Sequence, residues 1–90
     1  SESVDKNLHP LLQNSVSSNT LMAIMISPAI KIGLIRVQSG DEYFVRVGDL
    51  LGNAEGKITQ ITSDGIDVTE SDKVISLIVR NRSIANENAE

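Results

Sequence analysis

The chain has 90 residues, no cysteine and a formal net charge of −4. This length allows a single domain, and the missing cysteines exclude disulfides, a thiolate nucleophile and a cysteine-ligated zinc site. The acidic balance, with Tyr43 and Phe44 as the two aromatic residues, argues against nucleic-acid binding, which calls for a basic surface and stacking rings.

Both ends of the chain are polar. Residues 1–18 are rich in serine and asparagine and predict a flexible linker in which Leu8, Leu11 and Leu12 can pack onto the domain, while residues 81–90 predict a polar tail. The folded domain is therefore expected at residues 19–80. The longest apolar run, residues 21–26, is far too short to span a bilayer. We therefore expect no direct membrane insertion by this chain and expect any anchor to lie outside it.

The first half of the domain predicts a strand followed by a hairpin. Residues 21–26 form the first strand, which a following proline ends because proline cannot donate to a strand ladder. Residues 30–37 form the second strand, and residues 38–41 predict a turn in which Gly40 supplies the positive φ. With Ser39 and Gly40 as the loop, apolar residues meet on both faces. The predicted pairs are Ile32 with Val47, Leu34 with Val45, and Ile35 with Phe44.

The segment after this hairpin predicts a corner between two sheets. The third strand ends at Gly48, and Gly52 and Gly56 let the chain turn. Leu50 and Leu51 are expected to plug the core beneath the corner. The same segment has some likeness to a phosphate-binding loop, but three residues separate Gly52 from Gly56 where that motif needs four, and a β-like segment follows instead of a helix. The sequence favours a structural corner over a nucleotide site.

A second hairpin and a last strand follow. Residues 57–63 and 66–70 flank Asp64-Gly65, which is a strong signal for a two-residue turn. The predicted register places Ile61 opposite Val68, and Ile58 then falls on the other face, which indicates a bulge or a covering role. The last strand, residues 73–80, is apolar on both faces, which predicts a central position or burial on two sides. Its apolar residues are Val74, Ile75, Leu77, Ile78 and Val79.

These elements sum to six or seven short strands without helical periodicity, which predicts an all-β fold, either a small sandwich or a partly open barrel. No catalytic, cofactor or metal site is predicted. His9, the one histidine, has no neighbour that could form a catalytic group. The acidic residues near the second hairpin do not follow a calcium-binding pattern. The predicted turn residues are Gly40, Gly48, Gly52, Gly56, Asp64 and Gly65.

The strand at residues 21–26 is the best candidate for partner binding. It contains no charge, and an uncharged edge strand can accept a strand from a partner. The equally weighted alternative is an ordinary core strand covered by residues 8–16. Arg36 and Arg46 are candidate charge partners, with solvated strand residues as their ordinary role. The candidate partner-binding residues are Met22, Ile24, Ile26, Arg36 and Arg46.

The run from residue 33 to residue 70 resembles the periplasmic domain of the PilP family, from type IV pilus assembly, and more loosely the homology region of the GspC family, from type II secretion. The resemblance implies a sandwich of two three-stranded antiparallel sheets, a periplasmic location, docking onto the N-terminal domain of the outer-membrane secretin, and a link to inner-membrane pilus or secretion proteins. The matching residues are Val45, Val47, Gly48, Leu51, Gly52, Gly56, Lys57, Ile58, Ile61, Thr62, Ile66, Val68 and Glu70.

Two departures leave the pilus and secretion subfamilies both open. The tryptophan-containing acidic insertion of many PilP sequences is absent before the last strand, and no lipoprotein cysteine is present. We expect a non-enzymatic connector, tethered to the inner membrane by a segment outside this chain. The alternative is a small OB-like or SH3-like barrel that binds a ligand or nucleic acid, although a basic, aromatic face is missing.

Overall fold

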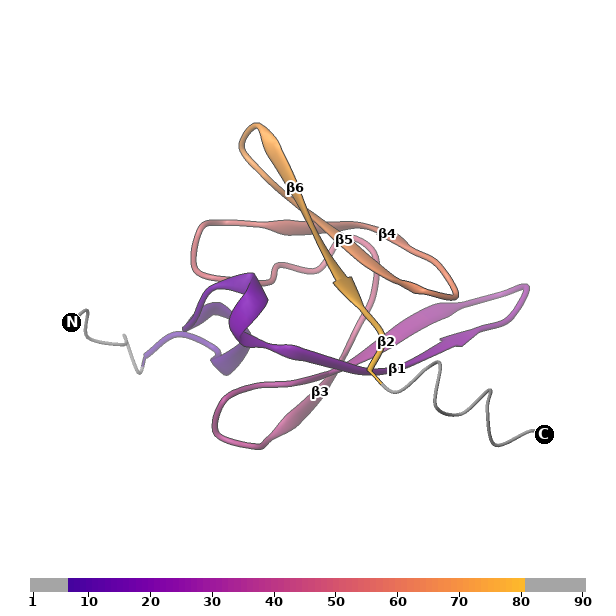
Figure 1. Cartoon of the computed structure of the whole chain (residues 1–90), viewed down its shortest axis with the longest axis horizontal. Helices are drawn as coiled ribbons and strands as arrows, with labels where there is room; N and C mark the ends of the chain where they lie inside the picture. Colours follow the sequence, from indigo (N-terminus) through magenta and orange to yellow (C-terminus); the bar gives the residue numbers. More distant parts are fainter. Residues whose placement is uncertain (1–6, 81–90) are drawn as a thin grey trace.

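Two antiparallel sheets of three strands each make up the computed structural model, which describes residues 7–80. Figure 1 shows them as two layers, with the chain passing once from the first sheet to the second. The predicted all-β sandwich of two three-stranded sheets is confirmed, and the barrel alternative is wrong. The first sheet contains β1 (Thr20–Ile26), β2 (Lys31–Arg36) and β3 (Glu42–Val45), and the second β4 (Lys57–Ile61), β5 (Gly65–Glu70) and β6 (Lys73–Ile78), each in that order.

The segment before β1 packs against the sandwich. It forms two 3-10 helices, η1 (Pro10–Leu12) and η2 (Val16–Ser18), which bury Leu11 and Val16 in the core. His9 caps η1, because its Nδ1 accepts the backbone N–H of Leu11 at 3.1 Å. Residues 7–18 are therefore attached to the domain and do not form the free linker that their polar composition predicts. Residues 1–6 and the predicted tail at 81–90 lie outside the described residues.

The core lies between the two sheets and is almost wholly aliphatic. β-branched residues dominate it, because they fit the half-buried surface of a pleated sheet. Central strands β2 and β5 each have a neighbour on both sides, and they contribute Ile35, Ile66 and Val68, which are all at most 1% exposed. The buried apolar residues are Leu11, Val16, Leu21, Ile35, Val37, Val45, Leu51, Ile58, Ile61, Ile66 and Val68.

The hairpin of β2 and β3 has a register one residue away from the predicted one. Val37 N–H donates to the Asp41 carbonyl and Gly40 N–H donates to the Val37 carbonyl, both at 2.9 Å. The loop therefore holds three residues instead of two, and Gly40 adopts a φ of 100°. A one-residue slip moves every side chain to the opposite face, so Phe44 is 68% exposed while Val45 is fully buried. The observed pairs include Gly33 with Val45, Leu34 with Phe44, and Ile35 with Tyr43.

The hairpin of β4 and β5 also differs from its predicted register. Thr62 N–H donates to the Gly65 carbonyl at 2.9 Å, so the loop residues are Ser63 and Asp64. Gly65 belongs to β5, where a Cβ would overlap the carbonyl oxygen of Leu77. The predicted bulge is confirmed between Ile58 and Gln60, and it places both isoleucines of β4 in the core. The observed pairs include Ile58 with Val68 and Ile61 with Ile66.

Strand β6 lies at an edge of the second sheet and its outer side is exposed, so the prediction of a central position or burial on two sides is wrong. Its outward side chains Val74 and Ile78 are 59% and 65% exposed. Its end joins the two sheets, because Arg80 N–H donates to the Leu21 carbonyl at 2.9 Å. Figure 1 shows the end of β6 beside β1. Within residues 7–80, no helix has the length and apolar character needed to cross a membrane.

Candidate functional site

The loop between the sheets, residues 46–56, is a structural corner. Leu51 N–H donates to the Gly56 carbonyl at 3.0 Å, and Gly52 N–H donates to the Leu11 carbonyl at 2.8 Å. These amides are the kind of donor that a phosphate-binding loop offers to its ligand, and here they bind carbonyls of the same chain. Leu51 is fully buried, as predicted, whereas Leu50 is 49% exposed and does not plug the core.

The glycines of this corner serve two different needs. Gly48 and Gly52 adopt φ values of 99° and 94°, which L side chains rarely adopt. Gly56 has no such φ, but a Cβ there would lie 2.6 Å from Val68 Cγ1 and 2.8 Å from the Leu51 carbonyl oxygen. Gly56 is therefore required by close packing of the corner on β5, which the turn signal in the sequence did not reveal.

Strand β1 lies at an edge of the first sheet. Ser27 and Ile30 exchange both backbone hydrogen bonds across the tight turn to β2. Because bonded and non-bonded pairs alternate along antiparallel strands, the N–H and C=O groups of Ile24 and Ile26 point away from β2. No backbone group within residues 7–80 pairs with them, whereas the Leu21 carbonyl at the other end accepts from Arg80. We call Ile24–Ile26 with these outward groups the β1 edge.

The structure places the three predicted β1 residues differently. Met22 lies at an irregularity in the pairing with β2 and is half-buried. Ile24 packs partly against the core, and Ile26 is 44% exposed beyond its rim. Ile24 and Ile26 thus combine outward backbone groups with apolar side chains on one face of the sheet. No charged residue of β1 blunts this edge.

The two predicted arginines are not equivalent. Arg36 is bonded to Glu42 on the neighbouring strand, with Nη2 and Nε at 2.7 and 3.0 Å from the same carboxylate oxygen. Arg46 follows β3, is exposed, and makes no ion pair among residues 7–80. Its backbone N–H donates to the Asp49 carboxylate at 2.8 Å. Arg46 is therefore the more available cation.

The outer face of the first sheet is apolar. The predicted register did not reveal this face, because it paired Phe44 with Ile35 instead of Leu34. Met25 and Phe44 stand on it at 59% and 68% exposure, and a shallow cavity of about 210 Å³ lies among its side chains. Exposed apolar surface of this kind marks interaction sites in soluble proteins. We call this surface the apolar face; its residues are Ala23, Met25, Ile32, Leu34 and Phe44.

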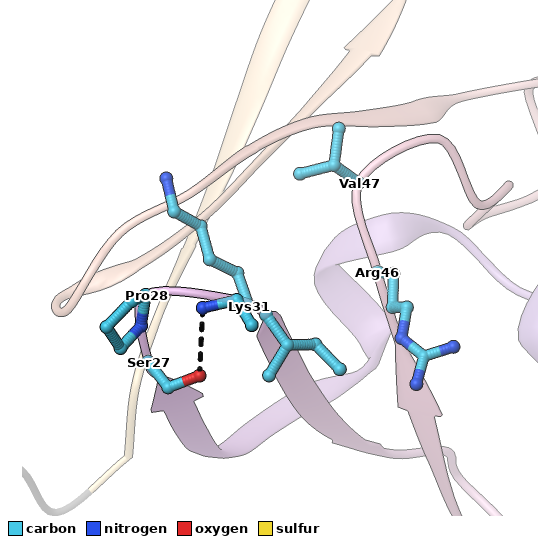
Figure 2. A pocket seen from close by; sticks show the side chains of 7 residues that line it. Ser27, Pro28, Lys31, Arg46 and Val47 are labelled. Atoms are coloured by element: carbon cyan, nitrogen blue, oxygen red, sulfur yellow. Dashed lines mark hydrogen bonds between the residues drawn. The ribbon is translucent and has the colours of Figure 1, made fainter.

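A cleft of about 350 Å³ lies where the β1–β2 turn meets the end of β3. Figure 2 shows the Ser27–Pro28 turn on one side and Arg46 and Val47 on the other, with the Lys31 and Arg46 side chains pointing in opposite directions. The Ala29 N–H donates to Ser27 Oγ at 3.3 Å. The cleft therefore has apolar walls with a cation on either side.

Within residues 7–80, no group of three or more histidine, aspartate or glutamate side chains is placed to hold a metal ion. His9 packs its ring edge-on against Tyr43, with centroids 4.9 Å apart. The features that stand out are surfaces, namely the β1 edge, the apolar face and the cleft beside Arg46.

Comparisons with known proteins agree with this architecture. The family model described as "Pilus assembly protein, PilP" matches residues 3–82. The solved domain of the type IV pilus biogenesis lipoprotein PilP from Pseudomonas aeruginosa is similar, with 26% identity, a TM-score of 0.67, and coverage of 78% of this chain and 93% of that one. Among curated proteins, nothing matches.

A solution structure of PilP from Pseudomonas aeruginosa shares the fold. It has a TM-score of 0.72 at 22% identity and covers 91% of this chain and 83% of that one. The family model covers nearly the whole chain, residues 3–82. The chain therefore belongs to the PilP family of pilus assembly proteins.

Proposed function

We propose that this chain is a non-enzymatic periplasmic connector of a type IV pilus machine. In this role it binds the N-terminal domain of the outer-membrane secretin and links it to inner-membrane assembly proteins, with a tether to the inner membrane. Membership of the PilP family supports the pilus over a type II secretion system. The solved relatives are described as type IV pilus biogenesis lipoproteins, which supports the periplasmic location.

The β1 edge is the observation that carries the secretin-binding role. Two donors and two acceptors, from Ile24 and Ile26, point outward from a strand that carries no charge. A strand of the partner that adds to this edge would satisfy all four groups, each bond contributing about 1 kcal/mol net. The 44% exposed side chain of Ile26 would be buried in the same contact.

The other edges of the two sheets are less suited to strand addition. Strand β3 begins with Glu42 and is followed by Arg46, β4 begins with Lys57, and β6 begins with Lys73. Charged residues of this kind discourage edge-to-edge pairing. The β1 edge is therefore the strand edge at which we expect the secretin domain to bind.

A titration of the isotope-labelled chain with the secretin's N-terminal domain tests the proposal. We expect backbone amide shifts to be largest at Ile24 and Ile26 and small on β5 and β6. No shift at concentrations near 1 mM, which corresponds to a binding free energy of about −4 kcal/mol, would reject secretin binding. Shifts confined to the second sheet would reject the β1 edge as its site.

A further inference from the structure

The apolar face lies at right angles to the β1 edge, because the side chains of a strand alternate across its sheet while its backbone groups point along it. The row formed by Ala23, Leu34 and Phe44 runs across all three strands. Met25 and Ile32 form a second row beside it. A partner could therefore cover this face and leave the outward backbone groups of β1 free.

The second sheet gives a direct comparison, because its outer face is largely polar. Thr59 and Thr69 share a hydrogen bond of 3.0 Å across β4 and β5, and Ser76 Oγ donates to Asp67 Oδ1 at 2.7 Å across β5 and β6. The exposed apolar residues there, Val74 and Ile78, belong to the edge strand. A continuous apolar surface over three strands thus distinguishes the first sheet.

The charges around the apolar face indicate the chemistry of its partner. At one end Arg36 is already neutralised by Glu42 at 2.7 Å. At the other end Arg46 is exposed and makes no ion pair within residues 7–80. The Asp49 carboxylate accepts the backbone N–H of Arg46 at 2.8 Å, but the Arg46 guanidinium itself has no ion-pair partner among residues 7–80. That guanidinium is therefore the cation that this face offers to a partner, on a chain whose net charge is −4. A carboxylate beside an apolar stretch complements this arrangement.

The conformation of the partner follows from what a sheet face offers. A sheet face presents side chains and no free backbone groups, so a segment that covers it must satisfy its own backbone hydrogen bonds. A helix does this internally and a folded sheet does it between its strands, as in the core of this domain, whereas a single extended segment does not. We propose that the apolar face together with Arg46 docks an acidic amphipathic helix of a partner protein, with apolar side chains beside Phe44 and a carboxylate at Arg46.

Two other occupants fit less well. A second copy of the chain carries Glu42 beside its own apolar face, but that carboxylate is already bonded to Arg36. An anionic membrane would attract Arg46 and repel the chain as a whole, because its net charge is −4. The proposal does not depend on which protein binds the β1 edge.

Two synthetic peptides of about 18 residues, long enough to form helix, serve as probes. Both carry leucine at the same helical face, and the remaining positions are glutamate-rich in one and lysine-rich in the other. Titrated into the labelled chain, the acidic peptide should shift the amides of Ala23, Leu34, Phe44 and Arg46. It should bind at least about threefold tighter than the basic one, as expected for a partly exposed ion pair.

Variants of the chain separate the ion pair at Arg46 from the apolar contact at Phe44. Arg46→Glu should reverse the preference between the peptides, and Phe44→Ser should weaken the acidic peptide about tenfold, since aromatic anchors dominate interfaces. Ile78→Ser is the matched control, because Ile78 has nearly the same exposure as Phe44 but lies on the other sheet. That control should leave both affinities unchanged.

Several results would overturn the proposal. These are equal affinity for the two peptides, no shift on the apolar face with either, or an equal loss in the Ile78→Ser control. Sedimentation that shows a dimer lost in Phe44→Ser would assign the face to a second copy. Stronger binding to vesicles of phosphatidylcholine and phosphatidylglycerol than to the acidic peptide would assign it to a membrane. Repeating the titration with the secretin domain bound separates this site from the β1 edge.

Discussion

Replacing Gly56 with alanine tests the packing of the corner between the two sheets. The new Cβ would lie 2.6 Å from Val68 Cγ1 and 2.8 Å from the Leu51 carbonyl oxygen, well inside the roughly 3.5–4.0 Å at which carbon atoms pack. Neither neighbour moves freely. Val68 is fully buried on the central strand β5, and Leu51 is hydrogen-bonded to residue 56 itself.

The magnitude follows from the cost of overfilling a core. Such substitutions typically cost 1–3 kcal/mol, and the upper part of this range, about 2–3 kcal/mol, is expected because one of the two contacts is with backbone. For a domain of this size, 1 kcal/mol lowers Tm by about 4–8 °C. Gly56→Ala should therefore lower Tm by about 10–20 °C, measured by circular dichroism.

Three other variants serve as controls for the physical cause. Gly48→Ala introduces the strain of a φ of 99° with nothing within 4 Å of the new Cβ, so it should cost only about 1 kcal/mol. Gly52→Ala combines a φ of 94° with a Val16 contact of 2.6 Å and should cost at least as much as Gly56→Ala. Lys57→Ala, at an exposed site, should stay within about 0.5 kcal/mol of the parent. A Gly56→Ala melt within about 3 °C of the parent, less than the shift from 1 kcal/mol, would refute the packing argument.

Three further predictions concern burial and surface charge, each measured by urea or thermal unfolding. Leu51→Ala should cost about 2–5 kcal/mol and its neighbour Leu50→Ala less than about 1 kcal/mol, because the first is fully buried and the second is 49% exposed; equal costs would contradict the observed corner. Phe44→Ser should change Tm by less than about 4 °C, the shift from 1 kcal/mol, whereas a large loss would favour the register that pairs it with Ile35. A double-mutant cycle on Arg36 and Glu42 should give a coupling below about 1 kcal/mol, because both side chains are more than a third exposed, and a larger value would mean that the pair is less solvated than it looks.

The strands could be predicted from the sequence because alternation and turn residues are local signals. The registers could not, because they depend on loop length, and Gly40 suits a three-residue loop as well as a two-residue one. The one-residue difference in loop length decides whether Phe44 or Val45 faces the core. The slip is also the reason why the apolar face was missed while the β1 edge was found.

The local sequence also does not show which apolar side chains become buried when the two sheets pack together. Strand β6 is apolar on both faces, yet it lies at an edge with Val74 and Ile78 exposed. The polar segment before β1 contributes Leu11 and Val16 to the core, although serine and asparagine surround them. In both cases the tertiary arrangement overrides what composition and pattern indicate.

The most direct test of the connector role is the affinity of the secretin's N-terminal domain for proline variants at two strand edges. Ile26→Pro removes an outward N–H of the β1 edge, and Val74→Pro makes the same change at the exposed edge of β6; Ile26→Ala keeps the N–H and isolates the side chain. Melting curves first establish that all three variants fold. Ile26→Pro should weaken binding about tenfold or more, because one bond is lost and its acceptor is left unpaired, while Val74→Pro should bind like the parent. Equal affinities for the two proline variants would contradict secretin binding at the β1 edge.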